Sequence, residues 1–132
     1  MKKVIEVSFP KGKQVSANIK GFDLLTDQPV AAGGNGEAAS PFDFFLSSLA
    51  TCAGFYAVSF CQSRDIDTTG MSVELSREVD KETKLISNIE IKLIVPTGFP
   101  EKYEKSILRA MDQCSVKRHL DNPPAISTIT VR

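Results

Sequence analysis

Apolar and polar residues alternate in short stretches near the start of the chain, and this pattern predicts β-strands. The alternation covers residues 4–9 and 15–19, and residues 10–13 (PKGK) between them have the composition of a turn. A third short strand is expected at residues 21–25. Residues 27–40, rich in Gly, Ala and Pro, follow as a loop too long for a simple connection, so this loop is either functional or held in place by a partner.

The same period of two returns after Gly70. Apolar residues alternate with polar ones over residues 71–79, and a second apolar series runs over residues 85–95. The polar residues 80–84 (DKETK) between the two series have turn composition. The pattern predicts a β-hairpin with one face toward solvent.

Between these two sets of strands, a long apolar segment predicts a helix from Ser40 to about Arg64. Ser40 can cap it, Pro41 suits the first turn, and Asp43 stands three residues after the cap. Its apolar residues cover nearly every face, which requires burial. A helix of about twenty residues could also span a membrane, but its Ser, Thr and Gly residues and the amphipathic strands on both sides favour a soluble core. These apolar residues are Phe42, Phe44, Phe45, Leu46, Leu49, Ala50, Cys52, Ala53, Phe55, Tyr56, Ala57, Val58, Phe60 and Cys61.

A second helix is predicted over residues 101–114, because its apolar residues fall on one stripe that ends with Cys114. A short basic turn at residues 117–119 and a last strand at Ala125–Val131 should follow. Strands, a helix, a hairpin, a helix and a strand in this order indicate an α+β fold. At 132 residues, we expect residues 1–132 to form a single domain.

Charge and composition exclude several classes of binding partner and several kinds of site. The 16 basic and 16 acidic residues cancel, so nothing attracts the chain generally to nucleic acid or to an anionic membrane. One His and three separated Cys without a C-x-x-C pair argue against a metal site, and no cofactor motif is present. The first residues contain no apolar run of signal-peptide length, so we expect a cytoplasmic protein with reduced thiols.

The cysteines are the main candidates for chemistry. Cys52 and Cys61 are nine residues apart on the predicted helix, hence on opposite faces with about 13 Å of rise between them, which no disulfide spans. Cys52 and Cys114 lie on apolar faces of two helices that would pack together, so they are the more plausible pair. Each Cys could equally be a small buried apolar residue. A reactive thiolate at Cys52 would need a nearby cation.

Several motifs together resemble the OsmC/Ohr family of osmotically inducible and organic hydroperoxide resistance proteins. The resemblance covers nearly the whole chain, including the order of elements. Its motifs are Asp27-Gln28-Pro29, Gly33-Gly34, residues 40–53 (SPFDFFLSSLATCA) and Cys114-Ser115-Val116.

The resemblance implies an OsmC-like fold, with antiparallel sheets wrapped around two central helices in an intertwined homodimer. It implies a thiol-dependent peroxidase of organic hydroperoxides that needs neither metal nor cofactor. Cys52 would match the peroxidatic cysteine and Cys114 the resolving cysteine, and an external dithiol would reduce their disulfide. Aromatic residues of the central helix would line an apolar substrate site, or they are ordinary residues of the hydrophobic core. These residues are Phe42, Phe44, Phe45, Phe55 and Tyr56.

One part of the family pattern is missing. The best-characterised peroxidases of the family activate the thiolate with an Arg from the N-terminal strands, held by a Glu before the Cys helix, and this chain has no Arg before Arg64. A lysine could substitute without the bidentate geometry of Arg, and the candidates are Lys11, Lys13 and Lys20.

Asp43 is the expected match for the family's acid, or else a helix-cap partner. It stands nine residues before Cys52, on the opposite side of the helix, and could therefore assist only a Cys52 of the other subunit. Glu37 is a weaker candidate, and His119 is expected to be a surface or core residue.

We therefore predict a cysteine-based peroxidase for alkyl or lipid hydroperoxides, with Cys52, Cys114 and Asp43 as its site. A non-catalytic protein that binds an apolar ligand is one alternative, which the missing Arg favours. A thiol redox sensor is another. A homodimer is also expected on physical grounds, because a chain of 132 residues can hardly cover a helix that is apolar all round.

Overall fold

The computed structural model describes residues 1–132 and divides into two compact units, Met1–Ser47 and Ser48–Arg132. The division falls inside the longest helix, α1 (Pro41–Gln62). The prediction of one domain over residues 1–132 stays a prediction.

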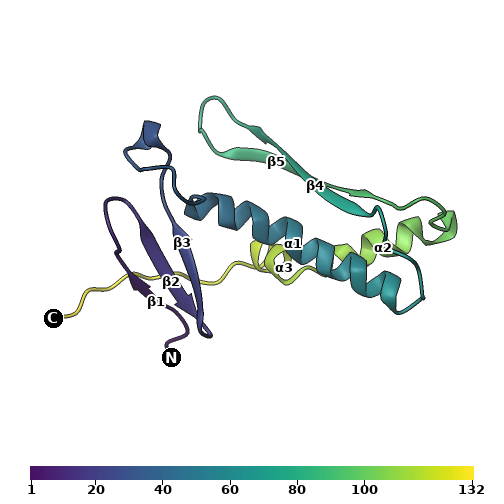
Figure 1. Cartoon of the computed structure of the whole chain (residues 1–132), viewed down its shortest axis with the longest axis horizontal. Coiled ribbons are helices and arrows are strands. Elements are labelled where there is room, and N and C mark those ends of the chain that lie inside the picture. Colours follow the sequence, from purple (N-terminus) through teal and green to yellow (C-terminus); the bar gives the residue numbers. More distant parts are fainter. The chain divides into compact units, whose positions relative to one another are not determined.

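The first unit contains a three-stranded antiparallel sheet in the order β1 (Glu6–Ser8), β2 (Val15–Ile19) and β3 (Phe22–Thr26) (Figure 1). All three predicted strands are confirmed. The two-residue turn between β2 and β3 needs left-handed backbone at both positions, and Lys20 and Gly21 supply it with φ angles of 52° and 84°.

Asp27 organises the Gly-rich loop that follows β3. This residue is fully buried, and its carboxylate accepts backbone N–H bonds from Gln28 (2.7 Å), Asn35 (3.5 Å) and Glu37 (3.2 Å). Burial raises the pKa of Asp27, but these bonds outweigh it and hold the pKa below its ordinary value. A Cβ at Gly34 would lie 2.0 Å from the Gln28 carbonyl oxygen, so the loop needs glycine there. The loop includes a 3₁₀ turn, η1 (Val30–Ala32).

The start of α1 confirms the predicted capping box. The backbone N–H of Ser40 donates to the Asp43 carboxylate over 2.9 Å, and the N–H of Asp43 donates to Ser40 Oγ over 3.2 Å. These two bonds satisfy donors that a helix start leaves without intrahelical partners.

The second unit contains the predicted hairpin, β4 (Ser72–Val79) and β5 (Ile86–Ile94). The strands pair antiparallel, with Leu75 opposite Ile91 and a bulge at Glu78/Val79. The Asp80 carboxylate closes the turn by accepting the backbone N–H groups of Glu82 and Thr83. The turn prediction for residues 80–84 is therefore confirmed.

The two segments on either side of Cys114 differ from the prediction. The helix predicted over residues 101–114 ends earlier, as η2 (Glu101–Tyr103) followed by α2 (Glu104–Met111). The basic turn at residues 117–119 is part of a helix, α3 (Ser115–Asp121). Cys114 separates the two helices, because its ψ of 122° is incompatible with helix continuation.

The last strand, predicted at Ala125–Val131, is absent from the structure. A segment with alternating apolar residues becomes a β-strand only where its backbone can hydrogen-bond to a neighbouring strand. These residues pair with none of β1–β5.

The core of the second unit lies on one face of α1. Ala53, Ala57, Phe60 and Cys61 form it with Ile107 and Met111 of α2, and the inner face of the hairpin packs against them. The prediction that α1 is buried on all sides was wrong for this single chain, since Phe55 is 60% exposed. By length and composition α1 could cross a membrane, a test that core helices of soluble proteins also pass.

Candidate functional site

The structure brings Cys52 and Cys114 together. Cys52 lies in the middle of α1 and is partly exposed, whereas Cys114 precedes α3 and is buried. The two side chains lie close enough for each thiol to shift the pKa of the other, and neither cysteine is in a disulfide. The expected proximity of this pair is confirmed, while the catalytic roles of both residues stay predictions.

Backbone N–H groups at the beginning of α3 surround the two sulfur atoms. Those of Ser115 and Val116 donate to Cys52, and those of Val116 and Lys117 donate to Cys114. The sequence pattern did not indicate these donors, because the basic residues after Cys114 have the composition of a turn rather than of a helix start. A cation was expected beside Cys52, whereas the structure supplies backbone N–H groups.

The two thiols respond to this environment in opposite directions. Burial raises the pKa of Cys52, but the hydrogen bonds from the Cys114 thiol and from the N–H groups of Val116 and Ser115 outweigh it and lower the pKa. Burial also raises the pKa of Cys114, and the bond that it donates to Cys52 and the charge of Cys52 raise it further. Cys52 is thus the thiol of the pair that ionises more readily, and Cys114 keeps its proton to higher pH.

An ion pair lies beside Cys114. Lys117 Nζ is 2.7 Å from Asp112 Oδ1, and this bond raises the pKa of Lys117 against partial burial. The charges of Asp121 and Cys114 raise the pKa of Lys117 further, so its side chain is an ammonium ion at neutral pH.

A cavity of about 450 Å³ adjoins Cys114, and most of its lining is aliphatic. Three charged residues, Glu90, Asp112 and Lys117, also border it. From α1 it is lined by Leu49 and Ala53, which flank Cys52 in the sequence. The remaining lining residues are Ile89, Ile91, Leu108, Met111, Cys114 and Leu120. Its size suits a small apolar ligand.

The aromatic walls predicted for the site are not found around this cavity. Its α1 lining residues, Leu49 and Ala53, are aliphatic, and Phe55 and Tyr56, which pack edge to face against each other, are not among its lining residues. Phe42 and Phe45 form another ring pair, and Phe44 is exposed.

The remaining candidates each have a hydrogen-bond or ion-pair partner of their own, and a catalytic role for Asp43 stays a prediction. Asp43 belongs to the capping box, and Glu37 forms an ion pair with Lys11 over 3.4 Å within the first unit. His119 is exposed on α3, where its Nδ1 lies 2.6 Å from the Ser115 carbonyl oxygen. No three His, Cys, Asp or Glu side chains lie close enough together to hold a metal ion.

A family model described as OsmC, OsmC-like protein, matches residues 34–129. The chain belongs to the OsmC family. The matched range contains α1, the hairpin and both site cysteines. No curated protein matches this OsmC-family chain.

Solved structures share the OsmC fold with the chain, at low sequence identity. An OsmC-like protein from Mycoplasma pneumoniae is 15% identical, with a TM-score of 0.72 over 93% of this chain and 89% of the other. An osmotic stress induced and detoxification response protein from Psychrobacter arcticus is 23% identical, with a TM-score of 0.75 over 89% and 88%. An organic hydroperoxide resistance protein from Elizabethkingia anophelis is 16% identical, with a TM-score of 0.61 over 93% and 91%. The α+β prediction with antiparallel sheets is therefore confirmed.

Proposed function

We propose that this OsmC-family protein is a thiol peroxidase that reduces organic hydroperoxides. The observation that carries the proposal is the Cys52–Cys114 pair, in which a partly exposed thiol of lowered pKa lies beside a buried thiol of raised pKa at the border of an aliphatic cavity. A low-pKa, accessible thiol next to a second thiol is the arrangement of a peroxidatic and a resolving cysteine. A solved structure of similar fold is named for organic hydroperoxide resistance, which agrees with this chemistry.

The reaction would follow in three balanced steps. The Cys52 thiolate attacks the terminal oxygen of a hydroperoxide, the O–O bond breaks, and the alkoxide leaves as an alcohol after taking a proton. Cys52 is then a sulfenic acid, which the Cys114 sulfur attacks to form the disulfide and release water. An external dithiol reduces the disulfide, becomes oxidised itself, and returns both thiols. Such reductants act in the cytoplasm, where we expect the protein to work.

The aliphatic cavity supports an organic substrate. Its lining would remove the alkyl part of a hydroperoxide from water while the polar end points toward the sulfur atoms. The same cavity favours the second candidate function, a non-catalytic protein that binds an apolar ligand. The two candidates differ in whether the cysteines react.

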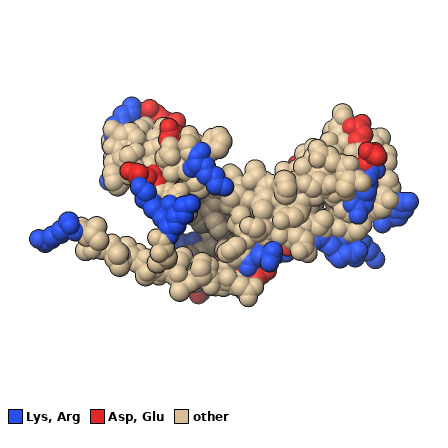
Figure 2. Space-filling model, turned by 90° about the horizontal axis from the view of Figure 1, so that it is seen from below, with Lys and Arg blue, Asp and Glu red and all other residues tan.

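We also propose that the protein is a homodimer. In residues 1–47 the buried side chains are those of Gln14 and Asp27, and neither is apolar. Phe9 and Phe22 of this unit are 79% and 69% exposed. Figure 2 shows charged side chains in small groups separated by wide uncharged areas. A unit without a buried apolar residue needs covering, and a second copy of the chain would supply it.

Analytical ultracentrifugation tests the homodimer. It should give about twice the 14.4 kDa mass of one chain. A monomer at every concentration would contradict the dimer, and would mean that Phe9 and Phe22 are covered by another part of their own chain or by a different partner.

Turnover of cumene hydroperoxide with a dithiol tests the enzymatic function. The wild-type protein should consume hydroperoxide in amounts far above one equivalent. A ligand-binding protein would instead lose no thiols quickly, and a redox sensor would undergo one slow oxidation without cycling. Asp43 can be tested in the same assay. Asp43→Asn retains a side-chain acceptor for the cap, so lost turnover in a folded variant would support a catalytic role for this carboxylate.

A further inference from the structure

Lys117 has a position that the proposed chemistry does not yet use. It stands three residues after Cys114, and the N–H of Arg118 bonds to the Cys114 carbonyl oxygen over 3.0 Å, so α3 begins its first turn at Cys114. Cys114 is the N-cap of α3, and Lys117 is the third residue of that helix, the position whose N–H an N-cap side chain faces. Lys117 and Cys114 border the same cavity.

Charge interaction joins the two residues. The negative charge of a Cys114 thiolate is among the influences that raise the pKa of Lys117, and the backbone N–H of Lys117 already bonds to the Cys114 sulfur. By the reciprocity of such interactions, the ammonium group favours the thiolate form of Cys114. Asp112, bonded to Lys117 Nζ at 2.7 Å, fixes the position of the side chain.

The resolving step needs what Lys117 can supply. While Cys52 is a thiolate, its charge and its hydrogen bond keep Cys114 protonated. Conversion of Cys52 to a neutral sulfenic acid removes that charge. Cys114 must then ionise, although it is buried, before it can attack Cys52.

We propose that Lys117 is a positioning residue for the resolving step, in which its ammonium group stabilises the Cys114 thiolate. The inference rests on the proposed peroxidase function. In this step the S–O bond of the sulfenic acid breaks and the S–S bond forms. Cys114 sulfur is oxidised and Cys52 sulfur is reduced. The departing hydroxide leaves as water with the proton that Cys114 gives up.

Other charged groups near Cys114 limit how strongly the Lys117 ammonium group stabilises the Cys114 thiolate. Asp112 and Asp121 partly neutralise Lys117, and Glu90 faces the cavity from β5. Cys52 faces Cys114 from α1. Lys117 is the cation among the residues that line the cavity, so its removal leaves the site with acidic groups.

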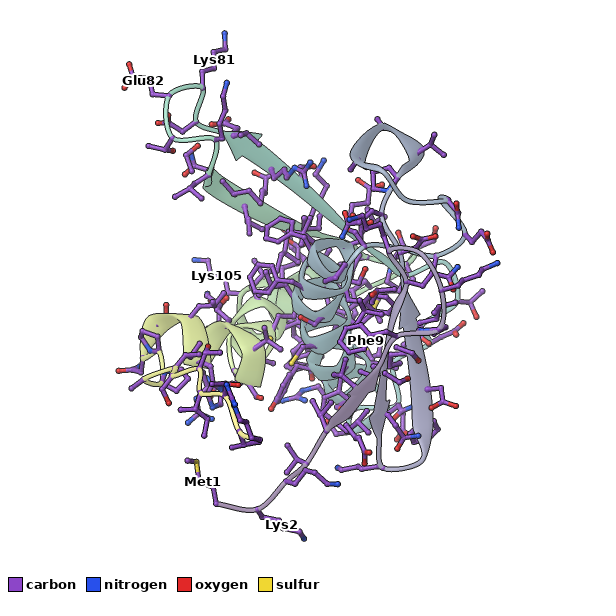
Figure 3. All side chains as sticks on the ribbon, turned by 90° about the vertical axis from the view of Figure 1, so that its left-hand side faces the viewer. Met1, Lys2, Phe9, Lys81, Glu82 and Lys105 are labelled. Atoms are coloured by element: carbon purple, nitrogen blue, oxygen red, sulfur yellow. The ribbon has the colours of Figure 1, made fainter.

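The first test needs no peroxidase activity. In a Cys52→Ser background, the rate of Cys114 alkylation by iodoacetamide is followed against pH by peptide mass spectrometry. Lys117→Met should move the Cys114 titration to higher pH and lower the rate at pH 7 about threefold to tenfold, since a tenfold loss of thiolate corresponds to one pKa unit. Lys117→Arg should restore it. Lys105→Met is the control, because Lys105 is exposed on α2 and points outward in Figure 3.

The second test follows oxidation by cumene hydroperoxide. Lys117→Met should oxidise Cys52 at the wild-type rate but accumulate sulfenic acid, trapped as a dimedone adduct. Lys117→Gln should behave alike, which guards against a folding defect in one variant. Unchanged titration of Cys114, or equal shifts in the Met and Arg variants, would overturn the role of Lys117. Failure of the wild-type protein to oxidise Cys52, to either the sulfenic acid or the disulfide, would overturn the peroxidase function and the resolving role with it, while the Cys114 titration would still show whether Lys117 acts on that thiol.

Discussion

Helix α1 carries two cysteines in different surroundings, Cys61 in the apolar core and Cys52 at a partly exposed position. Cys61 is fully buried in the apolar core, where its sulfur contacts the Met71 sulfur at 4.0 Å. Burial raises the pKa of Cys61, and the charge of Arg64 opposes this only in part. Cys52 is also partly buried, yet its pKa is lowered.

The difference lies in the hydrogen-bond donors that reach each sulfur. Cys52 receives one from the Cys114 thiol and two from the backbone of α3, whereas the Cys61 sulfur lies among apolar side chains and beside a thioether. Burial alone raises the pKa of a cysteine, and hydrogen-bond donors around a buried sulfur lower it again. The comparison shows that position on a helix does not determine reactivity, and that the segment packed against the sulfur does.

The largest expected contrast between the two cysteines is in turnover. Cys52→Ser should lower hydroperoxide turnover more than about a thousandfold, because it removes the nucleophile. Cys61→Ala should leave turnover unchanged in the same dithiol-coupled assay. Equal loss in both variants would show that the contrast is one of folding rather than chemistry.

The pH dependence of alkylation should separate the cysteines next. A lowered pKa means that the Cys52 thiolate persists below the ordinary thiol range, and a raised pKa means that Cys61 ionises only above it. Turnover should therefore rise with pH through the Cys52 pKa and level off before Cys61 ionises. At pH 7, iodoacetamide should modify Cys52 at least about tenfold faster than Cys61, as measured by peptide mass spectrometry. The reverse order would contradict the hydrogen-bond account.

Removing one donor should make Cys52 more like Cys61. Cys114→Ala deletes the thiol that donates to Cys52, so the Cys52 pKa should rise and its oxidation by cumene hydroperoxide at pH 7 should slow about threefold to tenfold. Cys114→Ser keeps a donor and should retain most of the rate. Stopped-flow oxidation of the two variants provides the comparison, and equal rates would assign the lowered pKa to the backbone donors alone.

The smallest effect concerns stability rather than chemistry. Cys61→Ser places a hydroxyl among apolar side chains and should lower the free energy of unfolding by about 1–3 kcal/mol, measured by urea denaturation. The same change at Cys52 should cost less, because hydrogen-bond partners surround that site. A larger loss at Cys52 than at Cys61 would contradict the assignment of the two environments.

Sequence pattern predicted the elements whose partners are close along the chain. The strands of the first sheet, the capping box at Ser40 and Asp43, and the hairpin with its Asp80 turn all have local signals of alternation and turn chemistry. The proximity of Cys52 and Cys114 followed from helical faces and from family resemblance.

The features that the sequence pattern did not predict depend on contacts between segments far apart in the chain or on backbone geometry. The break at Cys114 and the start of α3 place backbone N–H groups at both sulfurs, and no residue type marks such donors. Lys117 was predicted to lie in a basic turn. It borders the same cavity as Cys114 because residues 115–121 form a helix, which the sequence pattern did not indicate. The strand predicted at Ala125–Val131 lacks a partner strand, which alternation alone cannot supply.

Mass spectrometry after a single equivalent of cumene hydroperoxide, without added reductant, identifies which sulfur atoms react. One disulfide should form rapidly and join Cys52 to Cys114, while Cys61 stays reduced. Oxidation of Cys61 in preference to Cys52, or full retention of all three thiols, would contradict the assignment of Cys52 as the reacting thiolate.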